Sequence, residues 1–285
     1  MKRVVLYNSL AGNGAGKERA EALLSRWEGE EPDFLDIAKI DSYLSLFQSL
    51  APEDELILTG GDGTLNRFVN DTEGLALPEK IYYYPTGSGN DFWHDLELPA
   101  GAGPQEIGRY LRDLPTVTCK GQTRRVLNGV GYGIDGYCCE VGDKLRETSD
   151  KPVNYASIAI KGLLFHFKPV RASVTVDGKE YVFEKTWIAP TMNGRFYGGG
   201  MMPTPDQKRL ADDPKVSLML MHGSGKLKTL MIFPSLFKGE HVKHTKYVTV
   251  LEGKEIRVAF DRPAALQIDG ETVLNVSEYT VKTAK

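Results

Sequence analysis

Short apolar runs alternate with helix-spaced apolar residues over roughly the first 120 positions of the chain. Residues 3–7 form an apolar run that predicts a strand, after which Ala20, Leu23, Leu24 and Trp27 recur at the spacing of one helix face. The alternation then predicts, in order, a strand at 34–37, a helix carrying Leu44, Phe47 and Leu50, a strand at 55–59, a helix from Thr64 and a strand at 81–84. Strands that alternate with helices predict a parallel sheet covered by helices on both faces.

The second half of the chain shows short strands joined by tight turns. Asp177-Gly178 and Asp269-Gly270 each lie between two apolar runs, which is the signature of a two-residue β-hairpin. One helix is expected in this half, at residues 155–167. We therefore predict an α/β plus β fold, with a Rossmann-like α/β domain over 1–120 and an antiparallel, β-sandwich-like domain over 121–285.

The composition excludes several classes of protein. Hydrophobic residues make up 41% and charged residues 26%, so the chain can bury a normal core and disorder is not expected. The 35 basic and 38 acidic residues leave a net charge of −3, which offers no overall attraction to nucleic acid or to an anionic membrane. Any contact with phosphate or with a membrane must therefore be local.

The apolar runs and the cysteines predict the cellular location of the protein. No stretch approaches the roughly 20 apolar residues that span a bilayer, and the apolar run before Asn8 is too short for a signal peptide. The three cysteines have no zinc or disulfide spacing and fit reduced thiols. We expect a cytoplasmic protein without a transmembrane segment.

The strongest local motif is Gly60-Gly61-Asp62-Gly63-Thr64, between a predicted strand and a predicted helix. Glycines let a phosphate approach the main chain, and a helix start offers unpaired N–H groups. Thr64 is expected to cap the helix. Asp62 would repel phosphate on its own, so its presence favours a site with Mg²⁺ or a positioning hydrogen bond. An ordinary glycine turn is the alternative.

Two further loops are expected at the same edge of the sheet. Residues 85–91, Pro-Thr-Gly-Ser-Gly-Asn-Asp, again place glycines between a strand and a helix-like segment. Residues 8–17 follow the first strand but match neither the P-loop nor the dinucleotide fingerprint, so a flexible connection explains them equally well. Because ligands of open α/β sheets bind at the carboxyl ends of the strands, the loops together suggest a nucleoside triphosphate with its metal.

These loops, with three segments of the second half, carry a resemblance to a known family. The GGDGT and PTGSGND stretches resemble the nucleotide-binding half of diacylglycerol kinase catalytic domains, a family that includes sphingosine kinases and bacterial lipid kinases. Residues 128–135, residues 193–201 and Gln267-Ile268-Asp269-Gly270-Glu271 resemble successive segments of the same family. The GGDGT motif alone is shared with NAD kinases, whereas all the segments in order are specific.

The resemblance implies a kinase that transfers the γ-phosphoryl group of ATP to a hydroxyl of a diacylglycerol-like lipid, with the active site in the cleft between two domains. It implies ATP and Mg²⁺ as cofactors, Asp62 as a catalytic residue and metal partner, and Asp269 as the acceptor of the hydroxyl proton. A tight turn alone would also explain Asp269. The nucleotide-binding residues that it implies are Asn8, Ser9, Gly60, Gly61, Gly63, Thr64, Gly87, Ser88, Gly89, Asn90 and Asp91.

Three positions depart from the family. Ser9 stands where the family usually has Pro, and Arg67 stands where it usually has Glu, which reverses a charge near the expected phosphates. A structural Mg²⁺ loop of some members is represented at best by Asp212-Asp213-Pro214. Because proline forbids the positive φ that glycine would supply, that metal site is not expected here.

Two other functions remain open from the sequence: an NAD kinase, and a nucleotide-binding regulatory protein with little kinase activity. The expected partner is a lipid at the membrane surface, reached by transient peripheral contact, and no nucleic acid is expected. Residues 161–171 place Leu163, Leu164, Phe165 and Phe167 between Lys161 and Lys168 and suit either a membrane contact or a core helix with charged ends. Neither the lipid nor a homodimer is decided by the sequence.

Overall fold

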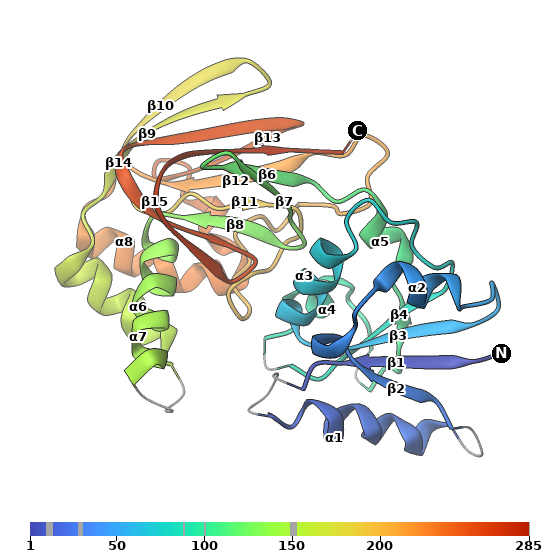
Figure 1. Ribbon diagram of the computed structural model, residues 1–285. Coiled ribbons are helices and arrows are strands. Elements are labelled where there is room, and N and C mark those ends of the chain that lie inside the picture. The colour runs from blue at the N-terminus through green and yellow to red at the C-terminus, as the bar shows by residue number, and fades with distance from the viewer. Residues whose placement is uncertain (10–13, 28–30, 88, 100, 149–152, 285) are drawn as a thin grey trace. The chain divides into compact units, whose positions relative to one another are not determined.

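The structure is a computed structural model that describes the chain except residues 10–13, 28–30, 88, 100, 149–152 and 285 (Figure 1). It divides into two compact units, Met1–Leu114 and Pro115–Lys285. The first is an α/β unit and the second is mainly antiparallel β, as the pattern of apolar residues predicts.

The first unit is built on a sheet with the strand order β2-β1-β3-β4-β5. Its strands are β1 (Arg3–Tyr7), β2 (Asp33–Asp36), β3 (Glu55–Gly60), β4 (Ile81–Pro85) and the short β5 (Gln105–Glu106). The first four strands are parallel, and β5 is antiparallel to β4. Helices connect them: α1 (Gly16–Glu21) with the 3₁₀ turn η2 (Ala22–Arg26), η3 (Ile37–Lys39), α2 (Tyr43–Gln48), α3 (Asp62–Asp71), α4 (Asp91–Asp95) and α5 (Gly108–Arg112).

Buried side chains hold these helices on the sheet. Ala20 and Leu23, from α1 and η2, pack against Val5 and Ile57 of the sheet. In a second cluster the ring of Tyr43 meets that of Phe68 edge-on at 5.6 Å between centroids, which joins α2 to α3. The predicted strands and helices of this unit are confirmed to within a few residues, because each carried its own apolar period.

The second unit contains a large antiparallel sheet with the order β13-β12-β11-β8-β14-β15-β6-β7, and the β9–β10 hairpin also pairs with β14. Its strands are β6 (Thr116–Cys119), β7 (Gln122–Arg125), β8 (Gly129–Tyr132), β9 (Val170–Val176), β10 (Lys179–Thr186), β11 (Thr191–Met192), β12 (Val216–Met221), β13 (Val248–Gly253), β14 (Glu255–Ile268) and β15 (Glu271–Lys282).

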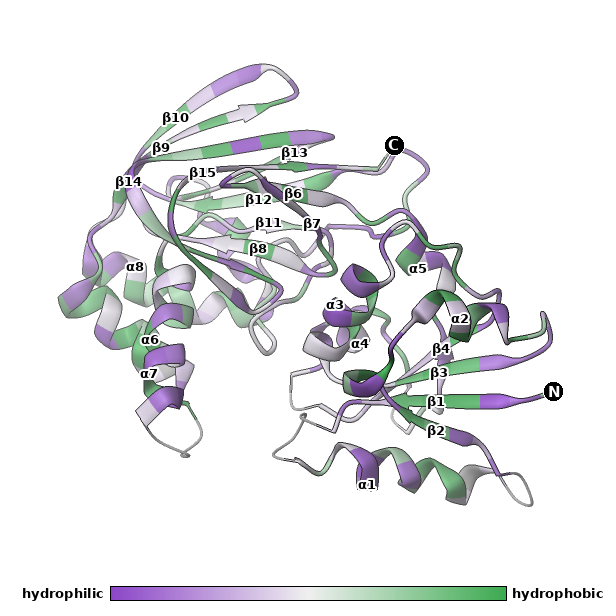
Figure 2. Cartoon of the chain, viewed as in Figure 1, coloured by the Kyte–Doolittle hydropathy of each residue, from purple (hydrophilic) through white to green (hydrophobic). Residues whose placement is uncertain are grey.

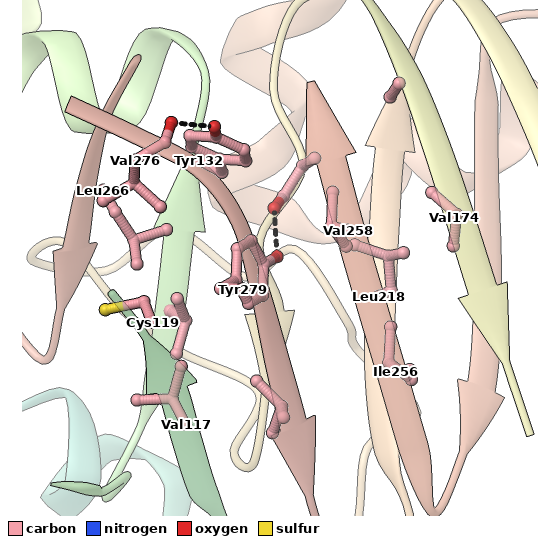
Figure 3. Close-up of a cluster of buried hydrophobic side chains, with 14 of the residues drawn as sticks. Val117, Cys119, Tyr132, Val174, Leu218, Ile256, Val258, Leu266, Val276 and Tyr279 are labelled. Carbon is pink, nitrogen blue, oxygen red and sulfur yellow. Dashed lines mark hydrogen bonds between the residues drawn. The ribbon is translucent and has the colours of Figure 1, made fainter. Parts of the chain in front are cut away.

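The long strand β14 changes partner midway. Residues 256–260 pair with β9, whereas residues 266–268 pair with β8, and the register to β15 shifts in between, around Pro263. Proline has no N–H to donate, so the ladder is interrupted there. Tyr132 stacks on Phe260 with 3.7 Å between ring centroids, and its hydroxyl donates to the carbonyl of Val276 in the core beneath (Figure 3).

The expectation of a single helix in this half is wrong. Besides α7 (Tyr155–Lys161) and the π-helix η4 (Gly162–His166), the structure contains α6 (Ile134–Thr148), α8 (Lys226–Ile232) and the 3₁₀ turns η5 (Phe233–Lys238) and η6 (Glu240–Lys243). Helix α6 lacks a clear signal because glycine weakens helix propensity. Its Gly136 is nevertheless required by packing, since a Cβ there would lie 1.8 Å from the Ala265 carbonyl oxygen.

Candidate functional site

Three loops of the first unit begin at the same edge of the sheet. Strands β1, β3 and β4 are parallel neighbours, with Leu6 opposite Leu58 and Gly60 opposite Pro85. The segments that follow these strands contain the predicted nucleotide-binding residues, from Asn8 and Ser9, through Gly60–Thr64, to Gly87–Asp91. Among them, Ser88 lies outside the described residues.

The second and third loops pack directly against each other, backbone to backbone. The Gly60 carbonyl accepts the N–H of Thr86 at 2.8 Å and the hydroxyl of Tyr83 at 3.0 Å. A Cβ on Gly61 would lie 3.2 Å from the Cα of Gly87, and one on Gly87 only 2.5 Å from the Cα of Gly61. The two motifs therefore need glycine for their mutual contact as well as for any phosphate.

Helix α3 starts two residues earlier than expected. Its N-cap is Gly61 and its first residue is Asp62, so the expectation that Thr64 caps the helix is wrong. The Thr64 side chain instead packs on the strand end, where a Cβ on Gly60 would lie 2.3 Å from its Oγ1. Gly63, in the first turn, is exposed and has open space where a Cβ would be. The start of α3 is thus open at Gly63, which suits the approach of an anion.

The Asp62 carboxylate joins the first turn of α3 to the first turn of α4. Its two oxygens accept the backbone N–H groups of Asp91 and Phe92, each at 2.8 Å. These are donors that a helix start leaves unpaired, so the carboxylate caps α4 from another element. The residue that the sequence suggests as a metal partner also fixes the geometry of the third loop.

Asn90 shapes the end of the third loop. Its backbone is left-handed, with φ of 55°, and its side-chain amide donates to the Gly87 carbonyl at 2.8 Å. The side-chain oxygen is buried and has no hydrogen-bond partner within the described part of the chain. A buried acceptor without a donor is costly, so this oxygen is suited to receive a proton donor or a cation from a ligand.

The first loop is held by contacts that its sequence does not reveal. The Ser9 N–H donates to the Asp36 carboxylate at 3.2 Å, and a Cβ on Gly16 would clash with the Asn8 carbonyl oxygen at 1.9 Å. From α1, Arg19 donates to the Thr86 carbonyl at 2.8 Å. This arginine was missed at the sequence level because α1 brings it to the third loop only through tertiary packing.

Arg67, which the sequence predicts near the phosphates, is not in the first turn of α3. It lies on the second turn, about half exposed, and pairs with Asp71 at 3.2 Å, one helical turn further on. Asp213, in the segment compared with a structural metal loop, pairs with Lys215 and Lys254. No group of three or more His, Cys, Asp or Glu side chains that could hold a metal ion occurs among the described residues.

In the second unit, Asp269 occupies the tip of the β14–β15 hairpin. Both Asp269 and Gly270 have positive φ, 47° and 91°, as a two-residue turn requires. The Asp269 carboxylate accepts three backbone N–H groups of the segment entering β8, at 2.6, 2.7 and 3.0 Å, from Leu127, Asn128 and Gly129. Burial raises the pKa of Asp269 to about 6, although these bonds act to lower it.

Two polar groups that were not predicted as site residues lie in this neighbourhood, although Asp135 ends the family-like segment 128–135. Arg209 donates to the Asn128 side-chain oxygen at 2.6 Å, and it comes from a loop without any recognisable motif. Asp135, near the start of α6, is buried and accepts a hydrogen bond from Gln267 at 3.0 Å. Burial raises the pKa of Asp135 to about 7, while the bond from Gln267 acts to lower it.

Comparison with known proteins decides the family. The profile described as "Diacylglycerol kinase catalytic domain" matches residues 2–126, and the one described as "YegS C-terminal NAD kinase beta sandwich-like domain" matches residues 128–281. The chain belongs to the diacylglycerol kinase catalytic-domain family. The resemblance in the glycine loops and in the second half is thereby confirmed, as is the two-part fold.

The alignments with relatives of this kinase family member cover most of this chain and most of each relative. A protein of Mycobacterium tuberculosis named "Diacylglycerol kinase" is 26% identical over 254 residues, which are 85% of this chain and 80% of the relative. The Bacillus subtilis protein named "Putative lipid kinase YtlR" is 26% identical over 236 residues, 76% and 73% of the two chains. A crystal structure of a Bacillus anthracis diacylglycerol kinase shares the fold, with a TM-score of 0.61, 17% identity and coverage of 99% and 94%.

No helix among the described residues of this family member has the length and apolarity to cross a bilayer.

Proposed function

We propose that the chain is an ATP- and Mg²⁺-dependent lipid kinase that transfers the γ-phosphoryl group of ATP to a hydroxyl of a diacylglycerol-like lipid. The observation that carries the proposal is the backbone contact of Gly61 with Gly87, which sets two glycine loops side by side at the carboxyl ends of parallel strands. This is where ligands of open α/β sheets bind, and the family relation supplies the reaction class.

The first unit would bind the triphosphate. The N–H groups at the start of α3 and the open space beside Gly63 suit a phosphate, and Arg19 adds a positive charge next to the third loop. Mg²⁺ takes oxygen ligands and usually keeps only one or two protein carboxylates beside the phosphates. The Asp62 carboxylate and the unpaired Asn90 oxygen fit that demand, and a bound Mg²⁺ would neutralise charge on the phosphates.

The second unit would supply the group that accepts the hydroxyl proton. With a pKa near 6, Asp269 is mostly ionised at neutral pH yet more basic than an ordinary aspartate, which favours proton transfer. Its three backbone donors fix its orientation, so they would hold the acceptor oxygen in place. Asp269 therefore combines a turn role with the proposed role as base.

The deciding experiment is transfer of labelled phosphate from ATP to dispersed lipids and to NAD, with and without Mg²⁺. We expect a labelled lipid, the strongest signal with a diacylglycerol, and no label without Mg²⁺. Label on NAD alone would assign an NAD kinase. Binding of ATP without transfer to any acceptor would assign a regulatory nucleotide-binding protein, and either result overturns the proposal.

A further inference from the structure

Three large apolar side chains protrude from the helices of the second unit. Phe165 in η4 is 73% exposed, and Leu227 and Met231 in α8 are 75% and 74% exposed. Among the residues that the structure describes, no other large hydrophobic side chain is as exposed. Leu227 and Met231 are four residues apart, so they lie on the same face of α8.

A hydrogen bond shows that these side chains come from neighbouring segments. The Lys226 ammonium group donates to the Leu164 carbonyl at 2.8 Å, which ties the start of α8 to the π-helix η4. Phe165 and Leu227 each directly follow one of these two bonded residues. Figure 2 shows hydrophobic and hydrophilic segments side by side on α8. We call Phe165, Leu227 and Met231 the apolar face.

The apolar face is not an unfinished part of the core. Leu163 of η4 and Ile232 of α8 are already buried, and with Leu236 of the following turn η5 they belong to the core cluster that contains Trp187 and Met219. The expectation that residues 161–171 form either a core helix or a membrane contact is thus too simple. Within one helical segment Leu163 points into the core, whereas Phe165 points out.

The two segments that carry the apolar face contain basic but no acidic side chains, and the nearest acid along the chain is Glu240, directly after the second of them. Residues 155–168 and 223–239, which contain η4 and α8, hold five lysines and no aspartate or glutamate, although the whole chain has a net charge of −3. The lysines are Lys161, Lys168, Lys226, Lys228 and Lys238. Protein-binding surfaces are depleted of lysine, whereas apolar side chains flanked by lysines suit a membrane interface with anionic lipids.

We propose that the apolar face and its lysines dock on the surface of a bilayer that contains anionic phospholipids. The proposal deepens the proposed function and rests on it, because a kinase that acts on a diacylglycerol must reach an acceptor that resides in a bilayer. Phe165, Leu227 and Met231 would enter the headgroup region, and the lysines would contact lipid phosphates. Near an anionic surface each lysine is worth about 1 kcal/mol, or about fivefold in binding.

The test is sedimentation of the full chain with vesicles of phosphatidylcholine, with and without phosphatidylglycerol. We expect binding to the anionic vesicles and a loss of roughly tenfold or more in the double variant Leu227→Gln, Met231→Gln. Glutamine keeps helix propensity and adds no charge. A matched control is Val182→Gln in β10, which removes a half-exposed apolar side chain from outside the helices and should bind normally. Lys161→Gln with Lys228→Gln should weaken binding to the anionic vesicles only.

A second measurement separates docking from catalysis. On dioctanoylglycerol below its aggregation concentration, the double variant should turn over like the wild type, whereas on vesicle-borne diacylglycerol its rate should fall with binding. A wild type that binds anionic vesicles but phosphorylates no lipid would overturn the proposed function and leave docking standing. Docking is overturned if the wild type does not bind anionic vesicles or if the double variant binds them as well as the wild type does. It is also overturned if the two substitutions only convert a dimer of the chain into monomers.

Discussion

The carboxylate of Asp62 accepts the backbone N–H of Asp91 at 2.8 Å, although 29 residues separate the two. The acid of the GGDGT motif is therefore a structural clamp on the third loop, in addition to the metal role proposed for it. A single substitution removes both functions, so the two have to be separated by the choice of variant.

Asp62→Ala should lower the free energy of unfolding by about 2 kcal/mol, because the backbone N–H groups of Asp91 and Phe92, in the first turn of α4, lose their acceptor. Asp62→Asn keeps one acceptor oxygen and should lose less stability. If Asp62 also serves the metal, both variants should lose turnover by roughly a hundredfold or more and require more Mg²⁺. Urea unfolding beside a Mg²⁺ titration of the kinase reaction measures both effects.

The two outcomes are independent. An Asp62→Ala variant as stable as the wild type would contradict the role of Asp62 in holding the third loop. An Asn variant with an unchanged Mg²⁺ requirement would remove the metal role.

Gly63→Ala is a clean test of phosphate binding at α3. Substitutions at Gly61 or Gly87 disturb the contact between the two loops, whereas a Cβ at Gly63 meets open space. Alanine favours a helix by up to about 1 kcal/mol, so the melting temperature should stay or rise. ATP affinity, measured by calorimetry, should fall by roughly tenfold or more because the methyl group occupies the approach of the phosphate.

The control for this variant is Gly225→Ala, which also places a methyl group in open space at a helix start but in the second unit. It should bind ATP normally. Unchanged affinity in Gly63→Ala would make the GGDGT loop a turn without a role in nucleotide binding.

Asp269→Asn tests the proposed base. Asparagine retains one acceptor oxygen for three N–H groups, so we expect a loss of about 1–3 kcal/mol in stability. At a temperature where the variant is folded, ATP affinity should be unchanged and lipid phosphorylation lower by roughly a hundredfold or more. In the wild type the rate should rise with pH as a group of pKa about 6 loses its proton, and the variant should lack this limb.

The matched control is Asp177→Asn. Asp177-Gly178 makes the same kind of turn, and the Asp177 carboxylate accepts the N–H groups of Lys254 and Glu255 at 2.9 and 2.8 Å. It should lose stability without losing turnover. Equal effects of both variants on turnover at matched stability would reduce Asp269 to a turn residue.

Asp135→Asn should change how stability depends on pH. Because burial raises the folded-state pKa of Asp135 to about 7, above the ordinary value of 3.8, the folded protein holds this proton more tightly than the unfolded chain. Its contribution to stability is therefore lost as pH rises from about 4 to about 7. Asparagine does not titrate in this range. As pH rises across it, the free energy of unfolding of the variant should therefore increase relative to that of the wild type, by up to about 4 kcal/mol.

Urea unfolding of both proteins at pH 5 and pH 8 checks the sign. If the variant and the wild type differ in free energy of unfolding by the same amount at pH 5 and pH 8, Asp135 is ionised in the folded protein at both values of pH.

Much of the fold was readable from contiguous residues. Apolar period and glycine turns gave the strands and helices of the first unit, because each element contains its own signal. The two Asp-Gly pairs located both hairpins, since few other residues adopt positive φ at both turn positions. Helix α6 was missed because Gly136 and Gly142 obscure its helical signal, and both are explained by packing against Ala265 and Tyr155.

The sequence by itself determined the two-part fold, the family and the three loops at one edge of the first sheet, because parallel strands send their carboxyl ends to the same side. Only the tertiary structure decided which partners the candidate residues have. It paired Asp62 with the start of α4, Arg19 with Thr86 and Asp269 with the segment entering β8. Hydrogen bonds between residues far apart in the chain depend on how whole elements pack, and no local pattern of residue types encodes that packing.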